Sequence, residues 1–103
     1  MDIQLKKGIL DLCVLHAISR NESYGYKIIS DLQGIIDISE STLYPILKRL
    51  EAGGYLTTRT AEYGGRLRRY YRITPSGLDK FRSGRDDLLE INTIYRKLFG
   101  GNI

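Results

Sequence analysis

The sequence predicts a mainly α fold with a small β-hairpin, arranged as a winged helix-turn-helix followed by a C-terminal dimerisation helix. Three observations lead to this prediction. A helical segment with one apolar face ends at the glycine pair 53–54, and two strand-like segments follow it, separated by the glycine pair 64–65. A long helical segment then runs to about residue 99. We expect residues 1–73 to form the winged-helix domain and residues 74–103 the dimerisation helix.

The first expected helix, residues 4–19, is apolar on two sides. One stripe consists of Leu5, Ile9, Leu12 and Cys13, and the other of Leu10, Val14, Ala17 and Ile18. A helix with apolar residues on two sides is usually buried on two sides. In a chain of 103 residues, the second side is expected to meet another subunit. The alternative is one wide surface that faces the chain's own core.

A short second helix is expected at residues 24–32. Ser23 is a suitable N-cap, and Gly34 is placed to end the helix in the left-handed conformation. The apolar residues Ile35, Ile36 and Ile38 then form a connector. One form that this connector can take is a short strand that pairs with the hairpin.

The third helix, which ends near Ala52, is the candidate recognition helix. Its buried face follows the spacing i, i+3, i+4 and i+7, with Leu43, Ile46, Leu47 and Leu50. Ser39 or Ser41 caps it. Ser41 accommodates Pro45 better, because the proline then lies at the edge of the first turn rather than inside the helix. We therefore place the recognition helix at residues 41–52.

Two strands are expected at residues 55–61 and 67–73, because Thr, Tyr and Arg dominate both segments. Gly64 and Gly65 provide the positive φ angles that the hairpin turn at residues 62–66 requires. Thr74 then caps the last helix, with Pro75 in its first position. Gly84 weakens the middle of this helix and bends it. Its apolar seam has coiled-coil spacing and consists of Leu88, Ile91, Tyr95 and Leu98.

Positive charge is concentrated in the hairpin. Residues 57–73 contain five arginines and one acid, whereas residues 1–53 contain six basic and seven acidic side chains. The whole chain carries a formal net charge of +4. Because the positive charge is local rather than spread over the surface, it favours a polyanionic partner.

The expected DNA contacts come from the outward face of the recognition helix and from the hairpin. Recognition helices present short hydrogen-bonding groups and cations on the face opposite the core. Among the arginines, Arg72 is expected to pair with an acid or shield the sheet, and the role of Arg59 is left open. The expected contacts are Ser41, Thr42, Tyr44, Pro45, Lys48 and Arg49 on the helix, and Arg66 and Arg68 near the hairpin tip. The alternative is an ordinary solvated helix face.

Other kinds of site find little support. Cys13 is the single cysteine, so no internal disulfide can form, and His16 is the single histidine, which leaves a metal site without further ligands of these types. No catalytic triad, phosphate-binding loop or cofactor motif is present. No apolar run approaches the 18 residues or so of a membrane span. We therefore expect a cytoplasmic protein that is not an enzyme and needs no cofactor or metal.

Four segments together resemble the PadR-type transcriptional repressors. They are KGILDL at residues 7–12, YGYKI at 24–28, STLYPILKRLE at 41–51 and RYYRIT at 69–74, followed by Gly77. The resemblance covers roughly residues 5–80. It implies a dimer in which the C-terminal helix packs against the first helix of the partner, which matches Leu5, Ile9 and Leu12 on one side and the apolar seam on the other.

The resemblance also implies an inverted-repeat operator in double-stranded DNA, upstream of the chain's own gene and of neighbouring detoxification or efflux genes. Effectors in the family are small aromatic acids or flat hydrophobic drugs. Short members can stack the drug on a tryptophan, which this chain lacks. Tyr95 or Phe99 takes that place by position, and the alternative is that both rings belong to the dimer core.

The sequence therefore predicts a homodimeric repressor. The alternative is a winged-helix module that binds another protein, in which the basic hairpin is a solvated edge that resists aggregation.

Overall fold

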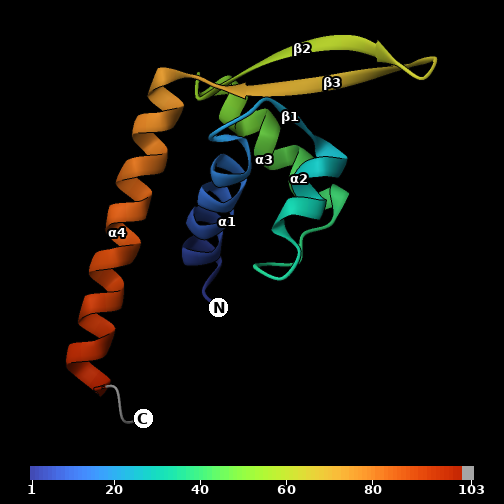
Figure 1. The fold of residues 1–103 in the computed structure, drawn as a ribbon. Coiled ribbons are helices and arrows are strands. Elements are labelled where there is room, and N and C mark those ends of the chain that lie inside the picture. The colour runs from blue at the N-terminus through green and yellow to red at the C-terminus, as the bar shows by residue number, and fades with distance from the viewer. Residues whose placement is uncertain (101–103) are drawn as a thin grey trace.

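The computed structural model describes residues 1–100 and consists of four helices and a three-stranded sheet (Figure 1). Residues 101–103 of the predicted C-terminal segment lie outside the described residues. The elements follow the order α1 (Ile3–Ile18), β1 (Ser23–Tyr24), α2 (Gly25–Leu32), α3 (Glu40–Ala52), β2 (Leu56–Tyr63), β3 (Arg66–Ile73) and α4 (Pro75–Phe99). This is the predicted winged helix-turn-helix followed by one long helix.

Helices α1, α2 and α3 form a bundle beneath the sheet, and α4 runs beside α1 (Figure 1). The β2–β3 hairpin, which we call the wing, projects beyond the bundle, and the molecule is 54 Å long and 23–26 Å across. The core is formed by apolar side chains from all three bundle helices, the α2–α3 connector and the sheet: Leu10, Val14, Leu15, Ile18, Ile28, Leu32, Ile38, Leu43, Ile46, Leu47, Leu50, Leu56 and Tyr71.

The sheet has the order β1-β3-β2 and is antiparallel. Strand β1 pairs with β3 only at Ser23↔Tyr71 and Tyr24↔Tyr70. Strand β2 pairs with β3 along its whole length, from Leu56↔Ile73 to Tyr63↔Arg66. The outer part of the wing is therefore two-stranded. It turns in two residues, Gly64 and Gly65, both with positive φ, so the turn is tighter than the five residues predicted.

The strand that completes the sheet is not the predicted one. The isoleucine connector forms no strand; Ile38 enters the core, while Ile35 is 64 % exposed. Ser23 was predicted to cap α2, but it belongs to β1 and its side chain is buried. Residue Tyr24 takes the N-cap position without a side-chain hydrogen bond. The backbone of Tyr24 is extended and pairs with the edge of β3. Tyr24 is therefore both the last residue of β1 and the N-cap of α2.

Helix α3 begins one residue earlier than predicted. Its N-cap is Ser39, whose Oγ accepts a hydrogen bond from the amide of Thr42. Pro45 therefore lies inside the helix and cannot donate to the carbonyl of Ser41. The helix tolerates this loss because its apolar face is buried in the core, and burial contributes more than one backbone hydrogen bond.

Helix α4 begins as predicted, with Thr74 Oγ1 accepting from the amide of Gly77 at 3.0 Å and Pro75 in the first position. The helix ends at Phe99. Gly84 has a role that the sequence did not show. A Cβ atom at this position would lie 2.9 Å from Cδ1 of Leu12, so the glycine permits close packing of α4 on α1.

Candidate nucleic-acid interface

Helix α3 separates its side chains into two faces. Leu43, Ile46, Leu47 and Leu50 are buried, as predicted. The six side chains expected to contact DNA are all exposed: Ser41, Thr42, Tyr44, Pro45, Lys48 and Arg49. The helix therefore offers a polar face to a partner while its other face is fixed by the core.

The N-terminus of α3 carries a cluster of three hydroxyl groups. Ser39 Oγ lies 3.0 Å from Ser41 Oγ and donates to Thr42 Oγ1 at 3.2 Å. These groups surround the end of the helix where backbone amides favour an anion. Short hydroxyl side chains here can donate to a phosphate oxygen or to a base edge.

The two cations of α3 are in different situations. Arg49 donates to the carboxylate of Asp11 on α1, which holds its guanidinium against the bundle. Lys48 makes no ion pair or side-chain hydrogen bond within residues 1–100 and is exposed. Lys48 is thus the cation of α3 that is available to an incoming anion without exchange of partners.

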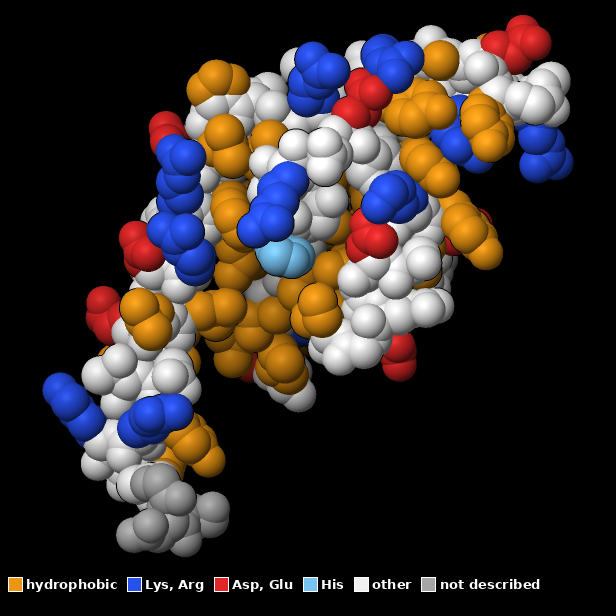
Figure 2. All heavy atoms as spheres, viewed as in Figure 1, with side chains coloured by type: hydrophobic (Ala, Val, Ile, Leu, Met, Phe, Trp, Pro, Cys, Tyr) orange, Lys and Arg blue, Asp and Glu red, His pale blue; other side chains and the backbone are white. Residues whose placement is uncertain are grey.

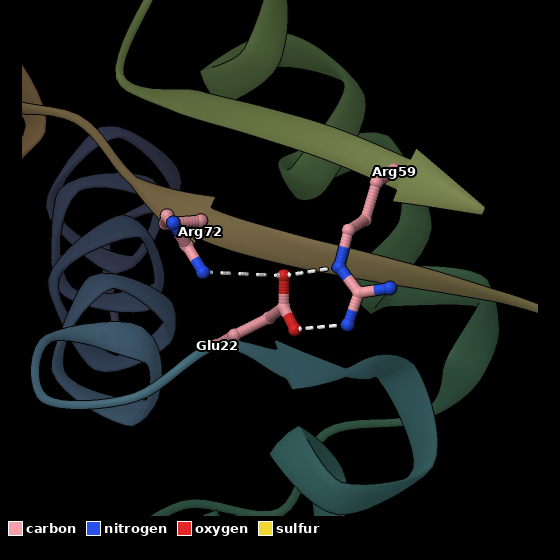
Figure 3. A network of polar contacts seen from close by, with 3 residues as sticks. All are labelled: Glu22, Arg59 and Arg72. Atoms are coloured by element: carbon pink, nitrogen blue, oxygen red, sulfur yellow. Dashed lines mark hydrogen bonds and ion pairs between the residues drawn. The ribbon is translucent and has the colours of Figure 1, made fainter. Parts of the chain in front are cut away.

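Glu22, which directly precedes β1, binds two arginines of the wing (Figure 3). Its carboxylate accepts from Arg59 Nε at 2.7 Å and Nη2 at 2.5 Å, and Arg72 Nη2 lies 3.9 Å away. The hydrogen bonds from Arg59 lower the pKa of Glu22, and the charges of both arginines add to this shift. The predicted pairing of Arg72 with an acid is confirmed, and Arg59 is the stronger partner.

A second carboxylate joins the wing to α3. Glu51 Oε2 accepts from the hydroxyl of Thr58 at 2.8 Å, and its other oxygen lies 3.8 Å from Arg69 Nη2. The end of α3 is thus linked to both strands of the hairpin. Because these contacts hold helix and wing together, the two elements can act as one surface.

The remaining wing arginines lie nearer the tip. Arg66 is exposed and makes no ion pair within the described part of the chain. The guanidinium of Arg68 contacts two tyrosine rings, 3.9 Å from the ring centre of Tyr24 and 4.0 Å from that of Tyr63. These two arginines are the ones that the sequence predicts to contact DNA.

A groove of about 600 Å³ separates the wing from α2 and α3. Tyr44 crosses the start of α2, with its hydroxyl oxygen 2.5 Å from where a Cβ of residue 25 would stand, so Gly25 makes room for it. The groove is lined by tyrosines and arginines: Tyr24, Tyr26, Tyr44, Tyr63, Arg66, Arg68, Arg69 and Tyr71, with Gly25, Gly64 and Leu67.

The sequence did not predict Tyr24, Tyr26 or Tyr63 as part of the site. Tyr63 could have been found, since strand alternation places it on the same face as Arg66, its partner across the hairpin. Tyr24 could not, because the two-residue strand that carries it leaves no periodic signal.

Apolar side chains remain exposed on α1 and α4. Figure 2 shows hydrophobic side chains gathered between α4 and the lower part of α1. Leu5 is 49 % exposed, and the predicted seam residues Leu88, Ile91, Tyr95 and Leu98 are between 40 % and 68 % exposed. Ile9 and Leu12 are half-buried. The rings of Tyr95 and Phe99, the expected effector contacts, lie 5.3 Å apart, centre to centre.

A separate apolar hollow of about 350 Å³ lies between α1, α4 and the C-terminal end of α2. Its lining includes Cys13, His16, Ile35 and Phe81. Partial burial raises the pKa of the Cys13 thiol, which disfavours the reactive thiolate.

Within residues 1–100, none of the helices is both long and apolar enough to cross a membrane. Nor do three or more His, Cys, Asp or Glu side chains of this part of the chain gather in a way that could hold a metal ion.

Comparison with known proteins gives consistent matches. The model of the PadR-like family of transcriptional regulators matches residues 14–83. The transcriptional regulator Rv3488 of Mycobacterium tuberculosis is 34 % identical over 99 residues, which is 95 % of this chain and 90 % of that protein. The crystal structure of smu.1704 from Streptococcus mutans superposes with a TM-score of 0.83 at 37 % identity, over 94 % of this chain and 92 % of the other.

One solved relative is bound to nucleic acid. Bacillus subtilis PadR in complex with operator DNA superposes with a TM-score of 0.69 at 28 % identity, over 73 % of this chain and 45 % of that one.

Proposed function

Because this chain belongs to the PadR-like family of transcriptional regulators, we propose that it is a homodimeric repressor that binds an inverted-repeat operator in double-stranded DNA. Each α3 enters a major groove, and each wing reaches phosphates or the adjacent minor groove. The half-sites are then about one helical turn apart or slightly more. The solved PadR–operator complex supports DNA as the partner.

The observation that carries this proposal is the shared groove between α3 and the wing. Tyr44 from α3 and Arg66 and Arg68 from β3 line it together. Lys48 and the hydroxyls of Ser41 and Thr42 extend the same surface along α3. A surface with cations, hydroxyls and aromatic rings on two rigidly joined elements suits a sugar–phosphate backbone and the base edges beside it.

The exposed apolar side chains of α4 support the proposed dimer. A helix with this much apolar surface in water is typical of an interaction site. In the proposed dimer, residues 74–103 form the dimerisation segment, and Leu88, Ile91, Tyr95 and Leu98 pack against Leu5, Ile9 and Leu12 of the partner. Two DNA-binding surfaces related by a twofold axis then match an inverted repeat.

The repressed genes are its own and neighbouring detoxification or efflux genes, and a small aromatic or hydrophobic effector releases the DNA. The effector binds at the dimer interface near Tyr95 and Phe99, whose rings are about half exposed. It acts by changing the distance between the two α3 helices. Such a ligand shifts the equilibrium only if it binds the released state more tightly than the DNA-bound state.

A gel shift with the DNA upstream of the chain's own gene tests the proposal, at two salt concentrations and against an unrelated duplex of equal length. We expect selective binding with a Kd on the order of 10⁻⁸–10⁻¹¹ M that weakens as salt rises. Equal and weak binding to both duplexes would contradict an operator in this region. The Lys48→Ala/Arg68→Ala double variant should lose binding; if it does not, the assigned surface is wrong.

A further inference from the structure

Arg59 and Arg68 lie on one face of the wing and make different kinds of contact. Arg59 donates Nε and Nη2 to Glu22, and its guanidinium carbon lies 4.5 Å from the ring centre of Tyr70. The guanidinium of Arg68 instead contacts two aromatic rings, those of Tyr24 and Tyr63. Within residues 1–100, no hydrogen bond or ion pair occupies the N–H groups of Arg68.

In the described part of the chain, the N–H donors of Arg68 are free to bind a ligand, whereas those of Arg59 are used by Glu22. A guanidinium is planar, carries its five N–H donors in the plane, and is attracted to the faces of aromatic rings. The two tyrosine contacts restrict the side chain. Its N–H donors have no internal partner within the described residues, so they are available to a ligand in the groove. The residue lines the groove between the wing and α3, and both tyrosines line the same groove.

We propose that Tyr24 and Tyr63 are positioning residues that hold Arg68 for a two-pronged contact with a phosphate of the DNA backbone. This inference rests on the proposed function and deepens it. Phosphate is the ligand that matches a fixed guanidinium fork, with two parallel N–H···O bonds. Because the side chain is fixed before binding, little of its conformational freedom is lost when the phosphate arrives.

Tyr63 is the better residue for a test. It is 60 % exposed at the last position of β2 and has no part in the core. Tyr24, in contrast, pairs its backbone with β3, precedes α2 and packs edge-on against Tyr70. A change at Tyr24 would disturb several elements, whereas a change at Tyr63 removes one of the arginine's two ring contacts.

The test is a double-mutant cycle of Tyr63→Leu and Arg68→Ala, with Tyr63→Phe as the matched variant that retains the ring. Binding is measured to the duplex upstream of the gene and to the unrelated duplex, across a series of salt concentrations. Tyr63→Leu should weaken binding roughly three- to tenfold, the range expected for loss of one cation–π contact. Tyr63→Phe should recover most of that loss.

Two further results are expected from the cycle. In the Arg68→Ala background, Tyr63→Leu should cause no further loss, because the tyrosine acts only through the arginine. Arg68→Ala should lower the affinity for both duplexes by a similar factor. It should also reduce the slope of log K against log salt by about 1, as removal of one phosphate contact does.

The inference is overturned if Tyr63→Leu binds as tightly as the wild type, or if it still loses affinity in the Arg68→Ala background, since Tyr63 would then touch DNA itself. If Arg68→Ala lowers the affinity for the upstream duplex alone, Arg68 contacts a base rather than a phosphate. In each of these cases the wild-type chain still binds DNA, so the proposed function stands. Failure of the wild type to bind either duplex would remove both.

Discussion

Glu22 and Arg59 lie 37 residues apart in the chain and form a two-pronged hydrogen bond, with Nε and Nη2 of the arginine at 2.7 and 2.5 Å from the two carboxylate oxygens. The pair ties the segment before β1 to the outer strand of the wing. It also commits one of the five wing arginines to an internal contact, and Arg72 lies beside the same carboxylate. The positive charge of the wing is therefore only partly available to DNA.

The Glu22 pair should make the stability of the fold depend on pH in the acidic range. The pKa of Glu22 is lower in the folded chain than its usual value of about 4.5. The unfolded chain thus takes up a proton first as pH falls, and the contribution of the pair is present above pH 4.5 and lost as pH passes through the lower, folded pKa. Glu22→Gln should therefore have a lower Tm than the wild type at pH 7. The difference in Tm between the two proteins should become smaller near pH 3.

Thermal unfolding of both proteins between pH 3 and pH 7 measures this, with Glu62→Gln as the control. Glu62 is exposed on the wing and forms no ion pair within residues 1–100. Parallel Tm curves for the wild type and Glu22→Gln over the whole range would contradict the prediction.

Lys48→Ala should weaken DNA binding without changing the stability of the fold. Lys48 is exposed and free of internal partners within the described residues, so its loss removes about one unit from the salt slope and leaves the Tm unchanged. Arg49→Ala should behave differently. It leaves the carboxylate of Asp11 unpaired, so it should also lower the free energy of unfolding by about 0–1 kcal/mol, the usual contribution of a surface ion pair, and the Tm with it.

Salt-dependent gel shifts and thermal unfolding of the two variants separate these effects, and Lys97→Ala at the far end of α4 is the control for a lost charge. Binding by Lys48→Ala with an unchanged salt slope would show that this lysine contacts no phosphate.

Ile91→Lys should dissociate the proposed dimer. Ile91 is 50 % exposed in the single chain and lies in the middle of the apolar seam of α4. A buried ammonium without a partner at a subunit interface costs several kcal/mol, which is enough to shift micromolar protein to the monomer. Because one α3 then acts alone, affinity for the upstream duplex should fall as well.

Sedimentation velocity at several protein concentrations measures the change, with Thr93→Lys as the matched control. Thr93 is two residues on, about 200° around the same helix, and is also exposed. A dimer that survives Ile91→Lys but not Thr93→Lys would place the interface on the opposite face of α4.

The parts of the fold that could be predicted from the sequence are those with a repeating pattern. Four apolar residues at helical spacing fixed the buried face of α3, and the glycine pair between two strand-like segments fixed the wing. Strand β1 has two residues and thus no period. Its position depends on which edge of β3 is free, and that is a property of the assembled sheet.

The candidate site shows the same limit. Helical periodicity predicted that Lys48 and Arg49 are exposed. It did not predict that Arg49 pairs with an acid while Lys48 has no partner within the described residues. Asp11 and Arg49 are 38 residues apart in the chain and meet only because α1 packs beside α3. The ring contacts of Arg68 likewise need Tyr24 from a strand that the sequence did not reveal. Long-range pairing of side chains depends on packing and leaves no local pattern.

Gly77→Ala should destabilise the fold strongly, although alanine is the better helix former. Gly77 is buried in the first turn of α4, and a Cβ there would lie 2.2 Å from the carbonyl oxygen of Tyr55 and 2.7 Å from Cγ1 of Ile73. That carbonyl accepts a hydrogen bond from the amide of Thr74, so it cannot move without loosening the start of the helix. We expect a loss of about 1–3 kcal/mol, the usual range for overpacking.

Gly8→Ala provides the comparison, since a Cβ at this position inside α1 meets no atom within 4 Å. Here the higher helix propensity of alanine should act alone and stabilise the fold by roughly 0.5–1 kcal/mol. Urea unfolding of both variants at one fixed protein concentration gives the two differences with opposite signs. Equal effects of the two substitutions would mean that the contact between the start of α4 and residue 55 is looser than the geometry shows.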